Sequence, residues 1–206
     1  MIAYFAMEIG LEDRIPTYSG GLGTLAGDTL YAYADIGIPA VGITLLYKKG
    51  YVSQRITPSG MQLDFDTPWD YKKILRPTNL QLQISFGDLV QEFTAWEYSI
   101  IGREEVKVFF LDASLPKNDP EIRKLNDRLY YDDGILRLRQ EILLGIGGYR
   151  LLKALGYNIS VYHINESHSA FLVVELIKEL GSKEEVRKRC VFTTHTPVPV
   201  GHDKFP

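Results

Sequence analysis

The stretch SGGLGTLAGDTLYAYADIGIPAVGITLL, residues 19–46, decides the predicted fold. Its opening glycines are followed by apolar residues at helical spacing, which predicts a helix over residues 24–35. Gly37 is placed to end this helix, and the apolar run of residues 38–46 predicts a buried strand. Alternating strands and helices are typical of a parallel sheet covered by helices.

The same alternation continues outward from this stretch. Residues 2–7 are short, apolar and aromatic, which predicts a first buried strand. Towards the other end we expect a long helix at 134–155, a strand at 160–164, a helix at 167–180 and a strand at 190–194. The predicted fold class is therefore α/β, with a Rossmann-like, mostly parallel, doubly wound sheet.

The middle of the chain has a different character. Strand-like runs at 51–56, 80–86, 90–101 and 106–111 are separated by Gly, Pro and Asp turn signals. This pattern predicts an antiparallel, β-rich insertion over residues 48–111. A doubly wound domain rarely finishes on a loop just after a strand, so we expect residues 1–206 to be a fragment of a longer protein.

Composition narrows the classes of function. The chain has 206 residues, is 45% apolar and 24% charged, and has a formal net charge of −3, which are ordinary globular proportions. Its charges are interspersed, so we expect no nucleic-acid partner.

We see no apolar run of membrane-spanning length and no secretory signal, so we expect no membrane partner and a cytoplasmic location. Cys190 is the only cysteine, which excludes an intramolecular disulfide and a multi-cysteine metal site.

The first candidate site is the glycine loop, Gly20-Gly21-Leu22-Gly23, at the start of the predicted helix. Main-chain amides at a helix start favour a bound anion or a developing oxyanion. The loop also partly resembles a dinucleotide fingerprint, but residues 8–19 separate it from the first strand, whereas in that fingerprint the glycines follow directly. A tight strand-to-helix turn without a ligand is the plainer alternative.

Two further candidate loops follow predicted strands near the C-terminal end. The first contains His163, Asn165, Glu166 and His168; a helix-capping network is its plainer interpretation, and the spacing does not match a zinc motif, so we expect no metal site. The second, residues 193–202, carries histidines and is stiffened by prolines, as suits a binding loop, and an ordinary surface histidine is the equally open alternative. Its histidines and prolines are His195, His202, Pro197 and Pro199. In an open parallel sheet, ligands bind beyond the carboxyl ends of the strands, where all three loops are expected.

Four motifs occur in the order found in one enzyme family. They are Tyr18-Ser19-Gly20-Gly21-Leu22-Gly23-x-Leu25-Ala26-Gly27-Asp28, Leu46-Tyr47-x-x-Gly50-Tyr51-x-x-Gln54, Asn165-Glu166-x-His168-x-Ala170-Phe171 and Phe192-Thr193-Thr194-His195-Thr196-Pro197. Together they closely resemble the N-terminal half of the α-glucan phosphorylases, which include the glycogen, starch and maltodextrin phosphorylases. The match is to the compact bacterial and archaeal branch, and it extends from Ile2 to Phe205.

The resemblance implies a GT-B glycosyltransferase, in which two Rossmann-like domains face a cleft. Such enzymes cleave the terminal α-1,4 bond of a glucan with inorganic phosphate and release glucose 1-phosphate. They carry pyridoxal phosphate on a lysine of a C-terminal domain, and no lysine here matches it. The resemblance thus implies that this chain alone is inactive and lacks its C-terminal domain, and it allows a homodimer.

Family roles transfer to matching positions as expectations. His195 matches a catalytic histidine beside the reacting glucose, and its neighbours Thr194 and Thr196 are expected to help bind the sugar. Glu166 and His168 match an Asp and His pair on the acceptor side, and Glu8 matches an acid near the cofactor cavity. The matched glycine loop, expected to face the substrate phosphate and the sugar, consists of Gly20, Gly21, Leu22 and Gly23.

The sequence is also compatible with other functions. A nucleotide-sugar glucan synthase would share the glycine loop, although such enzymes usually place a lysine just before it, where this chain has Tyr18 and Ser19. A carbohydrate-binding remnant without catalysis and a nicotinamide-dependent oxidoreductase are the alternatives from other classes.

Overall fold

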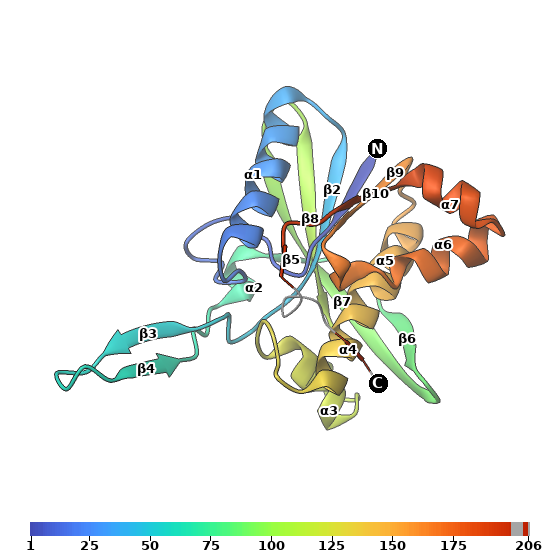
Figure 1. Cartoon of the computed structure of the whole chain (residues 1–206). Coiled ribbons are helices and arrows are strands. Elements are labelled where there is room, and N and C mark those ends of the chain that lie inside the picture. The colour runs from blue at the N-terminus through green and yellow to red at the C-terminus, as the bar shows by residue number, and fades with distance from the viewer. Residues whose placement is uncertain (199–203, 206) are drawn as a thin grey trace.

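One eight-stranded sheet forms the centre of the molecule, in the order β10-β9-β1-β2-β8-β7-β5, with β6 paired to β7 (Figure 1). The computed structural model describes residues 1–198, 204 and 205. Five neighbouring strands run parallel: β1 (Ile2–Phe5), β2 (Ala40–Leu45), β8 (Glu105–Asp112), β9 (Val161–Asn165) and β10 (Cys190–Thr193). The mostly parallel α/β arrangement predicted from the sequence is confirmed.

The antiparallel strands extend this sheet at one side. The long strand β7 (Leu89–Ile101) pairs antiparallel with β8, and it also pairs with β5 (Arg76–Pro77) and β6 (Leu82–Phe86). The predicted strand at 106–111 corresponds to β8, which pairs parallel with β2 as well as antiparallel with β7. Since β8 has both kinds of neighbour, the β-rich region is continuous with the parallel sheet.

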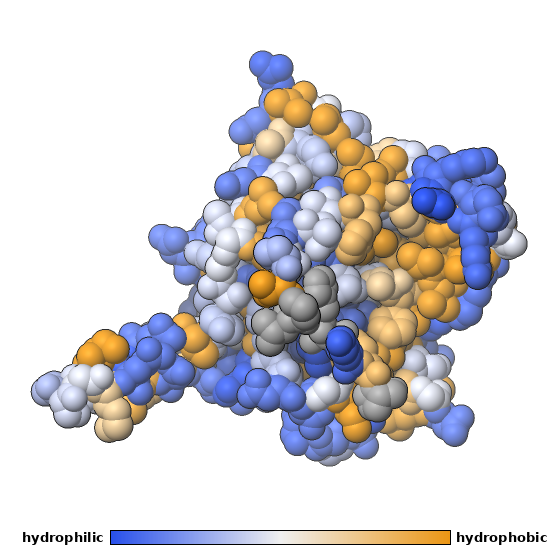
Figure 2. Space-filling model, viewed as in Figure 1, coloured by the Kyte–Doolittle hydropathy of each residue, from blue (hydrophilic) through white to orange (hydrophobic). Residues whose placement is uncertain are grey.

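A separate hairpin projects from the body of the molecule (Figure 1). It consists of β3 (Ser53–Ile56) and β4 (Gln62–Phe65), which pair with each other in a two-stranded sheet of their own. Large apolar side chains on it, including Ile56, Met61 and Phe65, are exposed, and Figure 2 shows apolar surface along this arm.

Helices cover both faces of the sheet, as a doubly wound fold requires. Tyr4 on β1 and Ala6 just after it pack in one core cluster with Leu30 of α1 (Gly21–Ile36). Ala3 and Phe5 point the other way and share a second cluster with residues of the helices that follow β8. These helices are α4 (Gly134–Ile142), a π-helical segment (Leu143–Gly147), α5 (Gly148–Ala154) and α6 (Leu172–Leu180). Shorter helices are α2 (Tyr71–Ile74), which precedes β8, and α3 (Pro120–Arg123) and α7 (Lys183–Arg189), which follow it.

The helix predicted over residues 134–155 is interrupted by this π-helical segment. Glycines allow very close packing there: a Cβ atom on Gly145 would lie 2.6 Å from the Leu172 nitrogen. A Cβ atom on Gly148 would lie 2.7 Å from side-chain atoms of Ile43 and Phe5. The widened turn thus lets the helix pack against the sheet and α6 together.

The other predicted ends shift by a few residues. Helix α1 begins at Gly21 rather than Thr24, and Gly37 ends it in the left-handed conformation, with φ of 79°. The helix predicted from residue 167 begins as a 3₁₀ turn, Ser167–Ser169, before α6. The helices of the described residues are each too short or too polar to cross a lipid bilayer.

Candidate functional site

The carboxyl ends of β1, β9 and β10 lie side by side at one edge of the sheet. Phe5 is in register with Ile164, and Asn165 is in register with Thr193. The chain segments that leave these three strands carry Glu8, Glu166 and the loop 194–196. Topology alone therefore gathers the candidate residues where open α/β sheets bind ligands.

Glu8 holds the glycine loop in place. Its side chain is buried, and one carboxylate oxygen accepts hydrogen bonds from the Ser19 amide at 2.6 Å and the Gly20 amide at 3.4 Å. The Ser19 hydroxyl donates to the same oxygen at 3.0 Å. A buried carboxylate that accepts several hydrogen bonds fixes its donors firmly.

The first turn of α1 presents main-chain amides that no side chain caps. The first amides of a helix lack partners within the helix and carry its positive dipole end. Gly21 is exposed, and a Cβ atom added there would meet nothing within 4 Å. At buried Gly23 a Cβ atom would lie 2.8 Å from a Glu8 oxygen, so this position must be glycine for the loop to approach Glu8.

Glu166 holds the loop that follows β10. Its carboxylate accepts hydrogen bonds from the Thr194 hydroxyl at 3.1 Å, the Thr196 amide at 3.1 Å and the His195 amide. Burial alone would raise the pKa of Glu166, but these hydrogen bonds outweigh it and hold the pKa below its ordinary value. Glu166 adopts a positive φ of 58°, an uncommon conformation for a residue other than glycine.

The histidines of this edge are fixed by neighbours from the adjacent strands. His195 Nε2 donates to the Asn165 side-chain oxygen at 3.2 Å. His163 Nε2 shares a hydrogen bond with the Thr193 hydroxyl at 2.7 Å, and its ring packs edge-on against Tyr4. Burial, followed by the charge of His195, lowers the pKa of His163. His163 is therefore part of the support for the site.

A tyrosine that sequence reasoning missed connects the two groups of residues. Tyr130 donates a hydrogen bond to the second Glu8 oxygen at 2.6 Å. Its ring lies edge-on to that of the buried His168, with 6.1 Å between ring centroids. Because Tyr130 lies far from Glu8 and His168 in sequence, in a region without a family motif, no local signal pointed to it.

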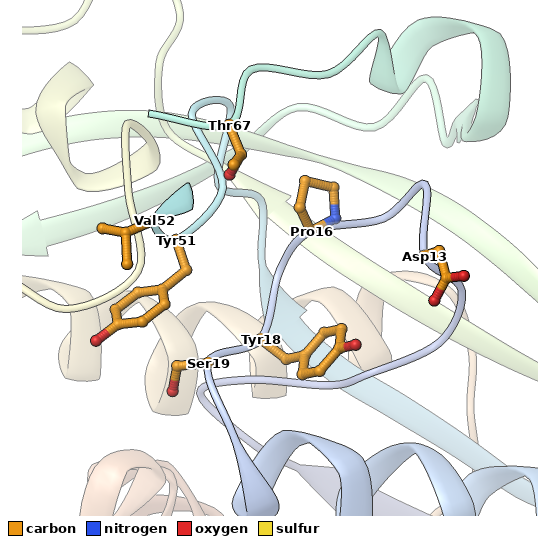
Figure 3. A pocket seen from close by; sticks show the side chains of 7 residues that line it. All are labelled: Asp13, Pro16, Tyr18, Ser19, Tyr51, Val52 and Thr67. Atoms are coloured by element: carbon orange, nitrogen blue, oxygen red, sulfur yellow. The ribbon is translucent and has the colours of Figure 1, made fainter. Parts of the chain in front are cut away.

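One cavity of about 280 Å³ lies beside the segment that leads into the glycine loop (Figure 3). Tyr18 and Ser19, on the segment leading into α1, line it from one side, and Tyr51 and Thr67, at the base of the hairpin, line it from another. Four cavities of the described residues, this one included, are lined by residues other than Gly21 and His195. The two loops lie at the same sheet edge, and Tyr130 contacts both Glu8 and His168 there. His202 and Pro199 lie outside the described residues.

Both oxygens of Glu8, the expected cofactor contact, are already engaged by Ser19, Gly20 and Tyr130. Within residues 1–198, 204 and 205 no group of three His, Cys, Asp or Glu residues is arranged to hold a metal ion.

Comparison with known proteins gives a consistent set of relatives. No protein-family model matches the chain. The chain is 40% identical over 220 residues to maltodextrin phosphorylase of Thermococcus litoralis, covering 100% of this chain and 26% of that protein. It is 38% identical over 229 residues to glycogen phosphorylase of Mycobacterium tuberculosis (100% and 26%) and 37% identical over 220 residues to that of Aquifex aeolicus (100% and 31%).

Because each alignment covers the whole chain, it spans the positions of all four motifs. The chain spans only about a quarter to a third of the length of these relatives. The resemblance stated from the sequence is confirmed: over its entire length, this chain is similar to a part of the α-glucan phosphorylases of bacteria and archaea.

Proposed function

We propose that this chain is the N-terminal, Rossmann-like part of a GT-B α-glucan phosphorylase. In that enzyme it would supply the glycine loop and the sugar and acceptor side of the cleft for phosphorolysis of terminal α-1,4-glucosidic bonds to glucose 1-phosphate. The observation that carries the proposal is the placement of two loops at one sheet edge, each held by a buried carboxylate, Glu8 or Glu166. The whole-chain similarity to maltodextrin and glycogen phosphorylases supports it.

The glycine loop is suited to an anion. Glu8 engages the Ser19 and Gly20 amides, while the following amides, from Gly21 to Gly23, start α1 without a side-chain cap. Such amides stabilise a phosphate or a developing negative charge without reorganising during the reaction. We therefore assign substrate phosphate and neighbouring sugar hydroxyls to these amides.

The loop 194–196 is suited to a sugar. The Glu166 carboxylate accepts hydrogen bonds from the Thr194 hydroxyl and from the His195 and Thr196 amides, so in the proposal Glu166 positions the loop. His195 is then the residue beside the reacting glucose. The Asn165 side-chain oxygen accepts the hydrogen bond from His195 Nε2 and so fixes the orientation of the ring. A fixed imidazole orientation is what a group close to the reacting bond requires.

Other components belong to the part of the relatives that this chain does not cover. The proposal places pyridoxal phosphate on a lysine there, together with the second wall of the cleft and the remaining phosphate ligands. A homodimeric, cytoplasmic enzyme acting on glycogen or maltodextrin is the corresponding whole protein. The chain alone is then expected to bind ligands weakly and to catalyse nothing.

Amide NMR spectra of the ¹⁵N-labelled chain test the ligand assignment. Inorganic phosphate at millimolar concentration should shift the amide signals of Gly21 and Gly23, and maltoheptaose should shift those of His195 and Thr196. In Gly21→Ala the added methyl group projects into open space, so the fold should be kept while the phosphate response weakens. Gly134→Ala, where a Cβ atom also meets nothing within 4 Å, is the matched control. Absence of any response to either ligand in the unmodified chain would contradict the assignment.

A further inference from the structure

Tyr130 has a backbone conformation that is costly for its side chain. Its φ is 59°, and the other non-glycine residues with positive φ in the described part of the chain are Asn79 and Glu166. Asparagine tolerates this region, whereas for a bulky aromatic residue it is an outlier. Such conformations persist when surrounding contacts over-determine them, and they concentrate at functional sites. Both costly outliers here, Tyr130 and Glu166, lie at the candidate site.

The hydroxyl group of Tyr130 acts on the glycine loop through one carboxylate. It donates to Glu8 Oε1 at 2.6 Å, while Glu8 Oε2 accepts from the Ser19 amide at 2.6 Å and the Gly20 amide at 3.4 Å. Burial, and secondly the charge of Glu8, raise the pKa of Tyr130, so the phenol keeps the proton that it donates. The carboxylate is thereby held from both sides.

The ring of Tyr130 contacts the other half of the site. His168, directly after β9, lies edge-on to it at 6.1 Å, and the Arg137 guanidinium of α4 lies 4.7 Å from the ring centroid. Tyr51, at the base of the hairpin, lies edge-on at 6.4 Å. Cation–π and edge-to-face contacts of this kind favour one ring position.

We propose that Tyr130 is a positioning residue that fixes the glycine loop, through Glu8, relative to the His168 side of the site. The inference rests on the proposed function, because it concerns the two loops assigned there to phosphate and glucan. Its chemistry is that of a rigid spacer: the hydroxyl group sets the Glu8 carboxylate, and the ring sets the distance to His168. Tyr130 itself need not touch a substrate.

Amide hydrogen exchange in the ligand-free 206-residue chain tests this role. Tyr130→Phe keeps the ring and removes the hydroxyl group, so exchange of the Ser19 and Gly20 amides should speed up about tenfold, as expected for loss of one hydrogen bond to a charged group. The His168 ring signals should stay in place in Tyr130→Phe and shift in Tyr130→Leu. Tyr131→Phe is the matched control, because the Tyr131 hydroxyl donates to the Lys124 carbonyl away from Glu8.

Unchanged exchange of Ser19 and Gly20 in Tyr130→Phe, or an equal increase in Tyr131→Phe, would overturn the proposal. The unmodified chain provides an independent check, since nuclear Overhauser effects between the Tyr130 and His168 rings are expected and their absence would also overturn it. Failure of the proposed function gives a different result: the unmodified chain would not respond to phosphate or maltoheptaose, whatever the exchange rates show.

Discussion

At the scale of single residues, Glu8 and Glu166 are buried carboxylates that bind main-chain amides and hydroxyl groups. In the described part of the chain neither forms an ion pair, although each is no more than 4% exposed. Hydrogen bonds to the charged form make burial tolerable and attach a loop to each carboxylate. In Glu166, the same bonds make the stability of the loop depend on pH.

The lowered pKa of Glu166 predicts acid sensitivity. A carboxyl group whose pKa is lower in the folded state stabilises the fold when the pH is above its unfolded-state pKa of about 4.3. This stabilisation is lost as the pH falls through the folded-state pKa. Thermal unfolding of the chain between pH 7 and pH 3 should show this loss, and Glu166→Gln should lower stability at pH 7 and flatten that part of the profile. Glu185→Gln is the control, because exposed Glu185 pairs with Lys188 on the surface. Parallel profiles for the chain and Glu166→Gln would contradict the assignment.

An added methyl group should strongly destabilise the chain at one glycine of α1 and have almost no effect at another. A Cβ atom on Gly27 would lie 1.7 Å from the Gly10 carbonyl oxygen, whereas one on Gly21 meets nothing within 4 Å. Gly27→Ala should therefore lower the free energy of unfolding by about 3 kcal/mol or more, since backbone must move, and Gly21→Ala should change it by less than about 0.5 kcal/mol. Urea unfolding of both variants checks this, and equal stabilities would show that α1 does not pack against Gly10 as described.

At the scale of secondary-structure elements, sequence periodicity located most helices and strands but not their irregularities. Apolar spacing predicted one helix at 134–155, but the π-helical segment Leu143–Gly147 depends on contacts with α6 and β2, which periodicity does not encode. Gly145, Gly147 and Gly148 were the only local sign of it. The strand β4 was missed because its four residues are all exposed and bury no apolar face.

Close packing at the π-helical segment gives a test of that element. Gly145→Ala should destabilise the chain by about 1–3 kcal/mol, because the methyl group would press on the Leu172 main chain. Gly134→Ala, in the same helical region but with open space around it, should be neutral or slightly stabilising. Thermal unfolding of the two variants measures the difference, and a stable Gly145→Ala would argue against close packing of α6 on this segment.

At the scale of the whole molecule, the parallel topology brings together residues that are far apart in the sequence. The strand–helix alternation was enough to predict that the loops after β1, β9 and β10 lie at one edge, and the family resemblance named Glu8, Glu166 and His195 as candidate residues. The Tyr130 link was not predictable, since it joins side chains 122 positions apart. The pairing of β8 with both β2 and β7 was missed for the same reason: strand partners depend on tertiary packing.

The central claim is that this chain is a working portion of an α-glucan phosphorylase. Replacing the matching 26% of the Thermococcus litoralis maltodextrin phosphorylase by this chain tests it most directly. The purified chimera should release glucose 1-phosphate from maltodextrin and inorganic phosphate, the His195→Ala chimera should lose at least about a hundredfold in rate, and the chain alone should give no product. A folded, cofactor-loaded chimera that releases no glucose 1-phosphate would contradict the account.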